Sequence, residues 1–369
     1  MSAFLGLVGH RLANLPPALT ASCTSLALGL TTAAPPPSPS SSSQKPQASA
    51  QAPTQPRGRP SSIAGTMLFM GTLGSTGVIL FQLLSVRAML TLLFGGAEPA
   101  KVYVREFLRS AGGRAHLDAT LSAAEVQTRA DMARDWRYGL FCALFGVVSA
   151  GVPEEILKYL PAATVRWWRA RKAAKAETKS TPRKGEAETA ASGEMSPLEF
   201  VNYTVAAGIG FAIFENIGVI YGSLSGGNSA AELLLLLAER TISALPGHVL
   251  CAALSGIRGA SIYRRRRSAD DGAAGKRKGG FVSGIVDTLS AILPSVLFHG
   301  VFDSALLGLS ALCGHPGWVR PADPWVQAGG YGMVVVMQGS LALMVRAAWR
   351  EEAREQALEE RTAGKKKAV

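Results

Sequence analysis

The stretch AAGIGFAIFENIGVIYG, residues 206–222, decides the fold class. It carries one charged side chain, Glu215, in a run of otherwise apolar and small residues. With its flanks it extends over 199–222, which matches the ~20 residues that a helix needs to cross the hydrocarbon of a bilayer. Small residues let helix backbones approach each other, and this stretch offers Gly208, Gly210, Gly218 and Gly222. It therefore predicts a membrane-spanning helix packed inside a bundle, with an acid in its interior.

Apolar blocks of similar length recur along the chain of 369 residues. Hydrophobic residues make up 48% of it and charged residues 17%, whereas ordinary soluble domains have ~25% charged residues. The first block contains Arg87, so we expect that span to be tilted or broken. The predicted fold is an all-α, polytopic transmembrane helical bundle of about six to eight spans. The clearest spans are predicted close to residues 64–94, 138–163, 199–222, 242–263, 281–312 and 325–347.

Basic residues cluster beside these blocks and account for the formal charge of +12. Segments 164–197, 264–280 and 346–369 hold eight, seven and seven Lys or Arg residues, while 223–241 and 313–324 hold one each. With six spans the three rich segments fall on one side of the membrane, as the positive-inside rule expects. The distribution identifies the lipid bilayer as the partner of this charge and argues against nucleic acid.

Three regions follow from composition. We expect residues 1–62 to form a disordered leader, since they are rich in Pro, Ser, Ala and Gln and offer too little apolar surface to fold. Residues 63–348 form the membrane-embedded domain, and 349–369 a basic C-terminal tail. No Asp or Glu precedes Glu98, so the leader is compatible with an organelle transit peptide, a secretory signal or a plain tail. The expected localisation is a multi-pass protein of a plastid, mitochondrial or endomembrane system.

The stretch GVPEEILKYL, residues 151–160, places two adjacent acids and a lysine in an apolar block. Adjacent helix residues point ~100° apart, so Glu154 and Glu155 face different directions. Lys158 follows them by four and three residues and is able to pair with either. The alternatives are an ion pair at a helix end, or a lysine that neutralises one acid while the other faces a polar cavity. Because block 138–168 is too long for one upright span, we expect a bend or break at 151–153.

Other spans carry polar groups that lack an evident partner in sequence. Asn216 follows Glu215, and Arg240 and His248 lie on either side of a Pro-Gly break. His299 and Asp303 are four residues apart and share a helix face, and a carboxylate beside a histidine is typical of metal ligands and general bases. The structural alternatives are a protonated glutamic acid for Glu215 and an anchor at the membrane interface for Arg240. For His248 and for the pair of His299 and Asp303 the alternative is a hydrogen bond between helices.

Intramembrane charges cost several kcal/mol unless they are paired or hydrated. We therefore expect these groups to meet in one wet pocket, where each relieves the desolvation of another. Two or three carboxylates with two imidazoles suit Zn²⁺ or a similar divalent ion. The same set also suits water activated by a carboxylate without a metal.

In chain order, the motifs EExxK, GFAxxEN, R…H and HGxxD resemble those of the PrsW family of intramembrane proteases, within the CAAX prenyl-protease and bacteriocin-processing superfamily. The matching residues are Glu154, Glu155, Lys158, Gly210, Phe211, Ala212, Glu215, Asn216, Arg240, His248, His299, Gly300 and Asp303. The resemblance covers residues 138–312 and implies a helical metallopeptidase that cleaves membrane-anchored proteins. It implies that Glu154 or Glu155 supplies the catalytic carboxylate. Glu215, His248 and His299 would bind the metal or position water, and Asp303 would orient His299.

The predicted function is thus an intramembrane endopeptidase with a Glu/His site that uses a divalent metal such as Zn²⁺. Its predicted catalytic residues are Glu154, Glu155, Glu215, His248 and His299, supported by Lys158, Asn216, Arg240 and Asp303. An ion-coupled transporter is the alternative from another class, since buried Glu and His also build proton relays. A catalytically silent membrane scaffold is the third. A resemblance in fold does not by itself distinguish among these functions.

Overall fold

A computed structural model describes residues 60–110, 121–177, 195–225, 228–272 and 281–367. These residues belong to one compact unit that begins at Pro56. The predicted leader up to residue 59 lies outside the described residues, so the choice among transit peptide, signal and tail stays open. Every regular element in the described ranges is helical, which confirms the all-α prediction.

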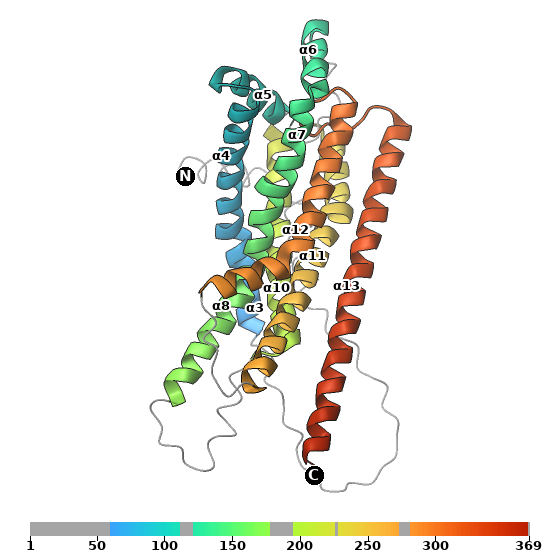
Figure 1. The fold of residues 1–369 in the computed structure, drawn as a ribbon. Helices are drawn as coiled ribbons and strands as arrows, with labels where there is room; N and C mark the ends of the chain where they lie inside the picture. The colour runs from blue at the N-terminus through green and yellow to red at the C-terminus, as the bar shows by residue number, and fades with distance from the viewer. Residues whose placement is uncertain (1–59, 111–120, 178–194, 226–227, 273–280, 368–369) are drawn as a thin grey trace, which may run out of the picture. The chain divides into compact units, whose positions relative to one another are not determined.

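Six helical runs are long and apolar enough to cross a membrane, as predicted (Figure 1). Their bounds are Gly65–Leu93, Trp136–Ala173, Pro197–Leu224, Ala230–Arg266, Ser283–Leu312 and Pro324–Glu359. The α-helices are α3 (Pro60–Phe69), α4 (Ser75–Leu93), α5 (Ala97–Arg109), α6 (Ala123–Arg134), α7 (Trp136–Leu144), α8 (Val152–Glu177), α10 (Pro197–Ser225), α11 (Ala230–Gly272), α12 (Phe281–Leu312) and α13 (Pro324–Lys367). Two π-helical segments, η1 (Met70–Gly74) and η3 (Phe145–Gly151), lie within the first and second runs.

The first run departs from α geometry at η1, and α4 continues through Arg87 without interruption. The expectation of a break at Arg87 is therefore wrong, and a tilt of this span stays a prediction. Its side chain lies on the exposed face of α4, where a long side chain can carry its charge toward the membrane surface. In the second run, η3 ends at Gly151, the first residue of the predicted bend at 151–153, and the chain continues directly into α8 without a break.

A close crossing of η3 and α12 sets the position of the acid pair. A Cβ atom on Gly300 of α12 would lie 2.6 Å from Val147 Cγ2 and 2.7 Å from Val147 Cα. A Cβ atom on Gly151 would lie 2.9 Å from the carbonyl oxygen of Val296. Only glycine permits this approach, which joins the start of α8 to the middle of α12.

The glycines of α10 divide into two pairs. Gly208 packs against α11, where a Cβ atom would lie 2.8 Å from Ala252 Cβ, and Gly210 packs against the backbone of Met67 in α3. Gly218 and Gly222 have no described atom within 4 Å of a Cβ position. The predicted close approach holds for the first pair and is wrong for the second, since the periodicity of glycine does not reveal where the neighbouring helix ends.

The C-terminal ends of α8, α11 and α13 lie at one end of the bundle, opposite α5 and α6 (Figure 1). This places the described parts of the three basic segments together, as the charge pattern predicted. The residues predicted as a tail from 349 onward continue α13 as far as Lys367. There Arg264 of α11 pairs with Glu352 of α13 at 3.0 Å and also contacts Glu355.

Candidate functional site

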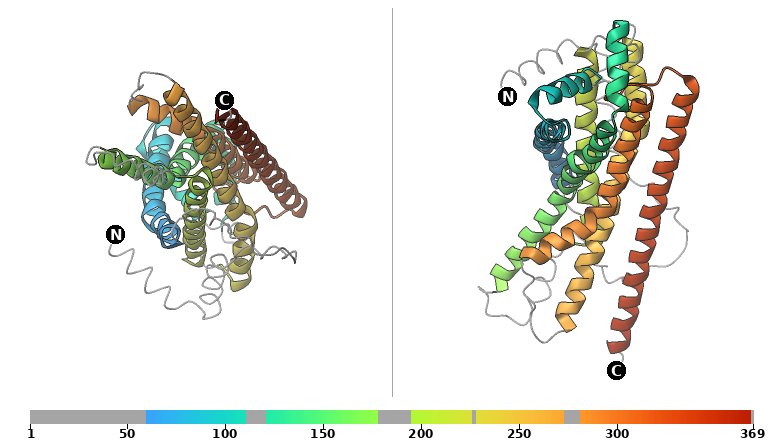
Figure 2. Two further views of the ribbon diagram at one scale, coloured as in Figure 1. Left: turned by 90° about the horizontal axis from the view of Figure 1, so that it is seen from below. Right: turned by 45° about the horizontal axis from the view of Figure 1, so that its top comes forward.

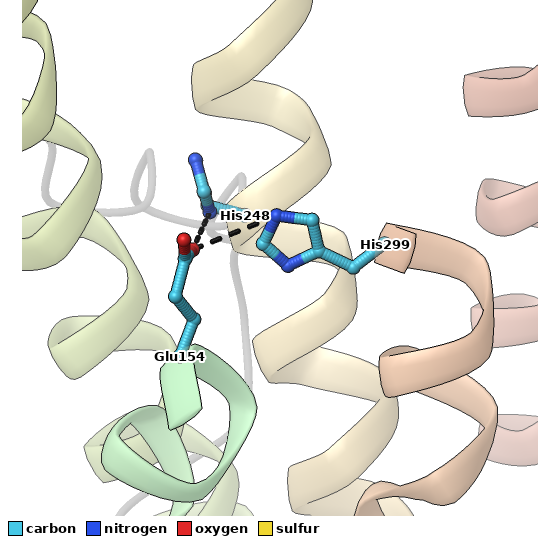
Figure 3. A group of neighbouring side chains, drawn as sticks. All are labelled: Glu154, His248 and His299. Carbon is cyan, nitrogen blue, oxygen red and sulfur yellow. Dashed lines mark ion pairs between the residues drawn. The ribbon is translucent and has the colours of Figure 1, made fainter. Parts of the chain in front are cut away.

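The predicted polar residues from four spans converge where α8, α10, α11 and α12 meet. α8 contributes the acid pair and lysine, α10 contributes Glu215 and Asn216, α11 contributes Arg240 and His248, and α12 contributes His299 and Asp303. Figure 3 shows Glu154, His248 and His299 pointing toward one another from three different helices. The structure thus brings together every residue singled out in sequence.

The centre of the cluster is the fully buried carboxylate of Glu155. Lys158 Nζ donates to its Oε1 at 2.7 Å, and His299 Nδ1 donates to the same oxygen at 3.0 Å. Glu155 and Lys158 have relative exposures of 0% and 1%. A buried ion pair is tolerated only when it is well hydrogen-bonded, so this contact is the structural anchor of the two motifs.

His248 is tied at both ring nitrogens. Its Nε2 lies 2.8 Å from Glu215 Oε2, and its Nδ1 lies 2.8 Å from Lys158 Nζ. An ammonium group only donates, so Nδ1 accepts and Nε2–H donates to Glu215. The ring therefore presents the lone pair of Nδ1 to the interior of the cluster, and Glu154 Oε2 lies 3.7 Å from that nitrogen.

His299 has a similar arrangement with the nitrogens exchanged. Since Nδ1–H donates to Glu155, Nε2 is the nitrogen that faces the interior, where it lies 3.5 Å from Glu154 Oε2 and 3.4 Å from Asp303 Oδ2. The two imidazole rings cross edge to face with centroids 5.3 Å apart. Each ring thus has one nitrogen held by a carboxylate and the other directed at Glu154.

Glu154 differs from its neighbour in where its second oxygen lies. Its Oε1 accepts from Gln82 Nε2 of α4 at 3.1 Å, and its buried Oε2 lies 3.5 Å from Lys158 Nζ and beside the inward nitrogens of both histidines. Neither this oxygen nor Oε2 of Glu155 has a hydrogen-bond partner among the described residues. Gln82 was not singled out from the sequence. An uncharged amide in an apolar span is a weaker signal than a charge, although its position inside that span was visible.

Arg240 closes the other side of the cluster. Its NH2 group pairs with Glu215 Oε2 at 2.9 Å and its Nε donates to Asn216 Oδ1 at 2.9 Å. Glu215, which has no basic neighbour in sequence, therefore has both a guanidinium and an imidazole as partners. These two partners offset the cost of burying the Glu215 carboxylate, which was the reason for singling it out in the sequence.

A cavity of about 540 Å³, measured to its opening, reaches this cluster from one side. It is lined by Glu215, Arg240, Ser243, Ala244, Gly247, His248, Cys251, Phe298, His299, Phe302, Asp303, Leu306 and Gln338. The cavity has charged and imidazole groups at its inner end and apolar side chains elsewhere on its wall. The cavity therefore gives access from one side to both histidines of the cluster and to Glu215 and Asp303.

The donor set fits a divalent cation. Glu154, His248 and His299 each offer one ligand atom, and these atoms lie within 4.8 Å of one another. The four carboxylates of the cluster face two permanent cations, Lys158 and Arg240, which leaves negative charge for a metal to balance. The sequence predicted Glu215 as the acid of the metal-binding group, but the structure has Glu154 in that place. Glu215 instead contacts Nε2 of His248, the ring nitrogen that points away from the group.

A family model described as PrsW family intramembrane metalloprotease matches residues 98–338. The match is longer than the resemblance seen in sequence and covers well over half of the chain. No curated protein and no solved structure matches the chain. Among the three predicted functions, the match supports the endopeptidase over the transporter and the scaffold. With six helices able to span a membrane and a buried Glu/His group at their centre, the chain belongs to the PrsW family of intramembrane metalloproteases.

Proposed function

We propose that Glu154 is the general base of this intramembrane endopeptidase and that His248 and His299 are its metal-binding partners. The observation that carries the proposal is the oxygen Oε2 of Glu154. It is buried, has no hydrogen-bond partner among the described side chains, and lies 3.5 and 3.7 Å from imidazole nitrogens of two other helices. A buried acceptor without a hydrogen-bond partner is costly. Glu155 Oε2 has no hydrogen-bond partner in the described part of the chain either, so the position of Glu154 Oε2 beside both imidazoles and 3.5 Å from Lys158 Nζ is what points to a function.

Three other carboxylates act as orienting groups. Glu215 and Glu155 each accept from one nitrogen of an imidazole and so fix which nitrogen faces inward. Metal-binding histidines commonly donate their second N–H to a carboxylate in this way. Asp303 borders the inward nitrogen of His299, and Arg240 and Asn216 hold the α10 side of the cluster.

Two imidazoles with a carboxylate beside them and further positions open are typical of catalytic zinc sites. We therefore propose Zn²⁺, held by His248 and His299, with the carboxylate of Glu154 next to it as the base. A bound metal would polarise the scissile carbonyl and lower the pKa of water. Lys158 would have to release His248 Nδ1 while keeping its contact with Glu155, since that nitrogen has one lone pair.

The chain's own groups suit the hydrolysis of an amide. Water in the cavity gives a proton to Glu154 Oε2 as its oxygen attacks the scissile carbonyl carbon. The same carboxyl returns the proton to the leaving nitrogen, as expected of a group that acts first as base and then as acid. Arg240 and Lys158 provide fixed positive charge next to the developing oxyanion. The apolar helices around the cluster limit access of bulk water and so strengthen these interactions.

The substrate is proposed to be a membrane-anchored protein, because the cavity opens among spans and not on a loop surface. The enzyme itself is a multi-pass membrane protein. Its substrate approaches within the bilayer as a membrane-spanning segment. Part of that segment must unwind from a helix before an extended stretch of its backbone can enter the site.

The test is cleavage of a tagged single-pass protein by the purified full chain in proteoliposomes. Glu154→Gln is expected to lower kcat by about 10⁴-fold or more, the scale seen when a catalytic group is removed. Asp131→Asn, on the exposed face of α6, is the matched control for loss of an acid. Wild-type cleavage by Glu154→Gln would refute the assignment of the base. Cleavage that survives complete removal of zinc by phenanthroline would refute the metal.

A further inference from the structure

We propose that the groove between α11, α12 and α13 binds an extended stretch of the substrate beside the scissile bond. We further propose that the N-terminal half of α13 is the movable wall through which this stretch arrives from the bilayer. The inference rests on the endopeptidase function and adds the substrate-binding surface and its route of access. Its occupant is the unwound, apolar part of a membrane-spanning polypeptide.

The groove continues the catalytic cavity. Arg240, Ser243 and Leu306 line both, and the groove extends from them over a volume of about 640 Å³ measured to its opening. Its wall is mainly apolar, and includes Leu236, Leu306, Leu309, Trp318 and Val334. A polypeptide with its scissile bond at Glu154 therefore has a continuous apolar path for its neighbouring residues. The lining also includes Glu239 and Arg320, which pair with each other at 2.6 Å.

The junction between cavity and groove is suited to a peptide backbone. Ser243, Ala244 and Gly247 give this face of α11 no large side chain, and the nearest atom to a Cβ position on Gly247 is Gln338 Nε2 at 3.9 Å. Gln338 of α13 donates to the carbonyl oxygen of Ser243. When α13 moves away, this amide and this carbonyl become a donor and an acceptor. An unwound substrate in a bilayer needs such partners for its backbone.

α13 is attached unevenly. Within its described part from Pro324 to Glu359, only Leu341 and Glu352 are buried, the first at the middle of this part and the second in its C-terminal half, and no residue before Leu341 is buried. Leu341 packs in a cluster with Cys251 and Leu254 of α11, and Glu352 pairs with Arg264. Figures 1 and 2 show α13 on the outer flank of the bundle. The C-terminal part is therefore the fixed end.

The N-terminal half of α13 has polar contacts that can be exchanged for others. Tyr331 Oη donates to Glu239 of α11, whose carboxylate also pairs with Arg320 at 2.6 Å. Together with the Gln338 contact, these hydrogen bonds hold the wall without a buried apolar core. Elements that move in function are drawn from such weakly packed regions. The expected motion is a swing of this half about the Leu341 region.

A reversible lock tests the movable wall. A Cβ atom on Gly330 of α13 would lie 2.9 Å from Leu309 Cδ2 of α12, so the pair Leu309→Cys and Gly330→Cys places two thiols side by side. Oxidation of the double variant is expected to lower turnover of a single-pass substrate at least about tenfold, as for other closed lids. Reduction should restore it. Each single-cysteine variant, treated alike, controls for the substitutions and for oxidation of native cysteines.

Photocrosslinking tests the occupant. In the Glu154→Gln background, where cleavage is expected to be slow, a benzophenone amino acid at Val334 faces the groove, whereas one at Val336 lies on the exposed face of the same helix. The single-pass substrate is expected to be captured from position 334 at least about tenfold more than from 336, since helical side chains two residues apart diverge by ~200°. Equal capture from both positions, or preferential capture from 336, overturns the groove.

The two proposals fail in different ways. A fully crosslinked double variant that cuts at the wild-type rate overturns the movable wall but leaves the protease intact. A wild-type chain that cuts nothing under the same conditions overturns the endopeptidase itself, and with it the groove. Loss of turnover in the reduced double variant but not in the single variants would also count against the wall, since no crosslink would then explain it.

Discussion

Replacement of Gly300 by alanine should disable the active site while leaving the protein folded. The added methyl group would lie 2.7 Å from Val147 Cα, and ordinary van der Waals contact begins at 3.4 Å. Packed interiors do not absorb such overlap, so α12 and η3 must separate by about 0.7 Å. His299 precedes this residue on α12, and Glu154 and Glu155 follow η3, so the separation acts directly on the cluster.

The magnitude follows from the hydrogen bond between His299 Nδ1 and Glu155 Oε1. It spans 3.0 Å, and a shift of about 0.7 Å takes it beyond hydrogen-bond range. Misplacement of a catalytic group by 1 Å costs about 10²-fold in rate, and we expect a fall in kcat of that order. Overpacking costs about 1–3 kcal/mol, and alanine regains about 1 kcal/mol over glycine in a helix. The free energy of unfolding should therefore fall by no more than about 2 kcal/mol.

The assay is cleavage of the single-pass substrate by purified enzyme, together with thermal unfolding in the same detergent. Gly308→Ala is the matched control. Gly308 lies on the same helix as Gly300, and a Cβ atom there has no described neighbour within 4 Å. It should keep wild-type activity. The reasoning is wrong if Gly300→Ala cleaves within twofold of wild type, or if both variants lose activity equally.

Two further substitutions test other contacts. Gln82→Leu removes the hydrogen-bond donor to Glu154 Oε1. Because a hydrogen bond to a charged group contributes about 1.5–3 kcal/mol, kcat should fall roughly 10- to 100-fold. An unchanged kcat would exclude Gln82 from the site. Arg264→Ala leaves the buried carboxylate of Glu352 unpaired and should lower the unfolding free energy by about 3 kcal/mol, whereas Arg265→Ala, whose side chain is 58% exposed, should cost less than about 1 kcal/mol. Equal shifts in melting temperature for the two arginine variants would contradict the assignment of the buried pair.

The sequence predicted the spans and the convergence of their charges because both follow from the cost of polar groups in lipid. A carboxylate such as Glu215 has few structural explanations there, so it was found without a structure. The sequence does not show in the same way which face of each helix points toward the cluster. Glu154 and Glu155 are adjacent, and only the packing of η3 on α12 shows that Glu155 is the acid held by Lys158 and His299 and that Glu154 places an oxygen beside both imidazoles.

The same limit explains the predictions that the structure changed. Gly218 and Gly222 have the spacing of a packing face but meet no neighbouring helix. Arg87 was expected to interrupt its helix, yet an arginine on an exposed face needs no break. These errors concern which face of a helix meets a partner, and a single sequence with clear hydropathy does not contain that information.

The contact between Gln82 and Glu154 has a practical consequence for work on this enzyme. Gln82 lies on α4, ahead of residue 98 where the match to the family begins. A recombinant fragment trimmed to the matched boundaries would retain every charged group of the cluster and still lack one wall of its active site. Screening of shortened versions for crystallisation or inhibitor discovery should therefore start upstream of α3, or an inert fragment could be mistaken for an inactive enzyme.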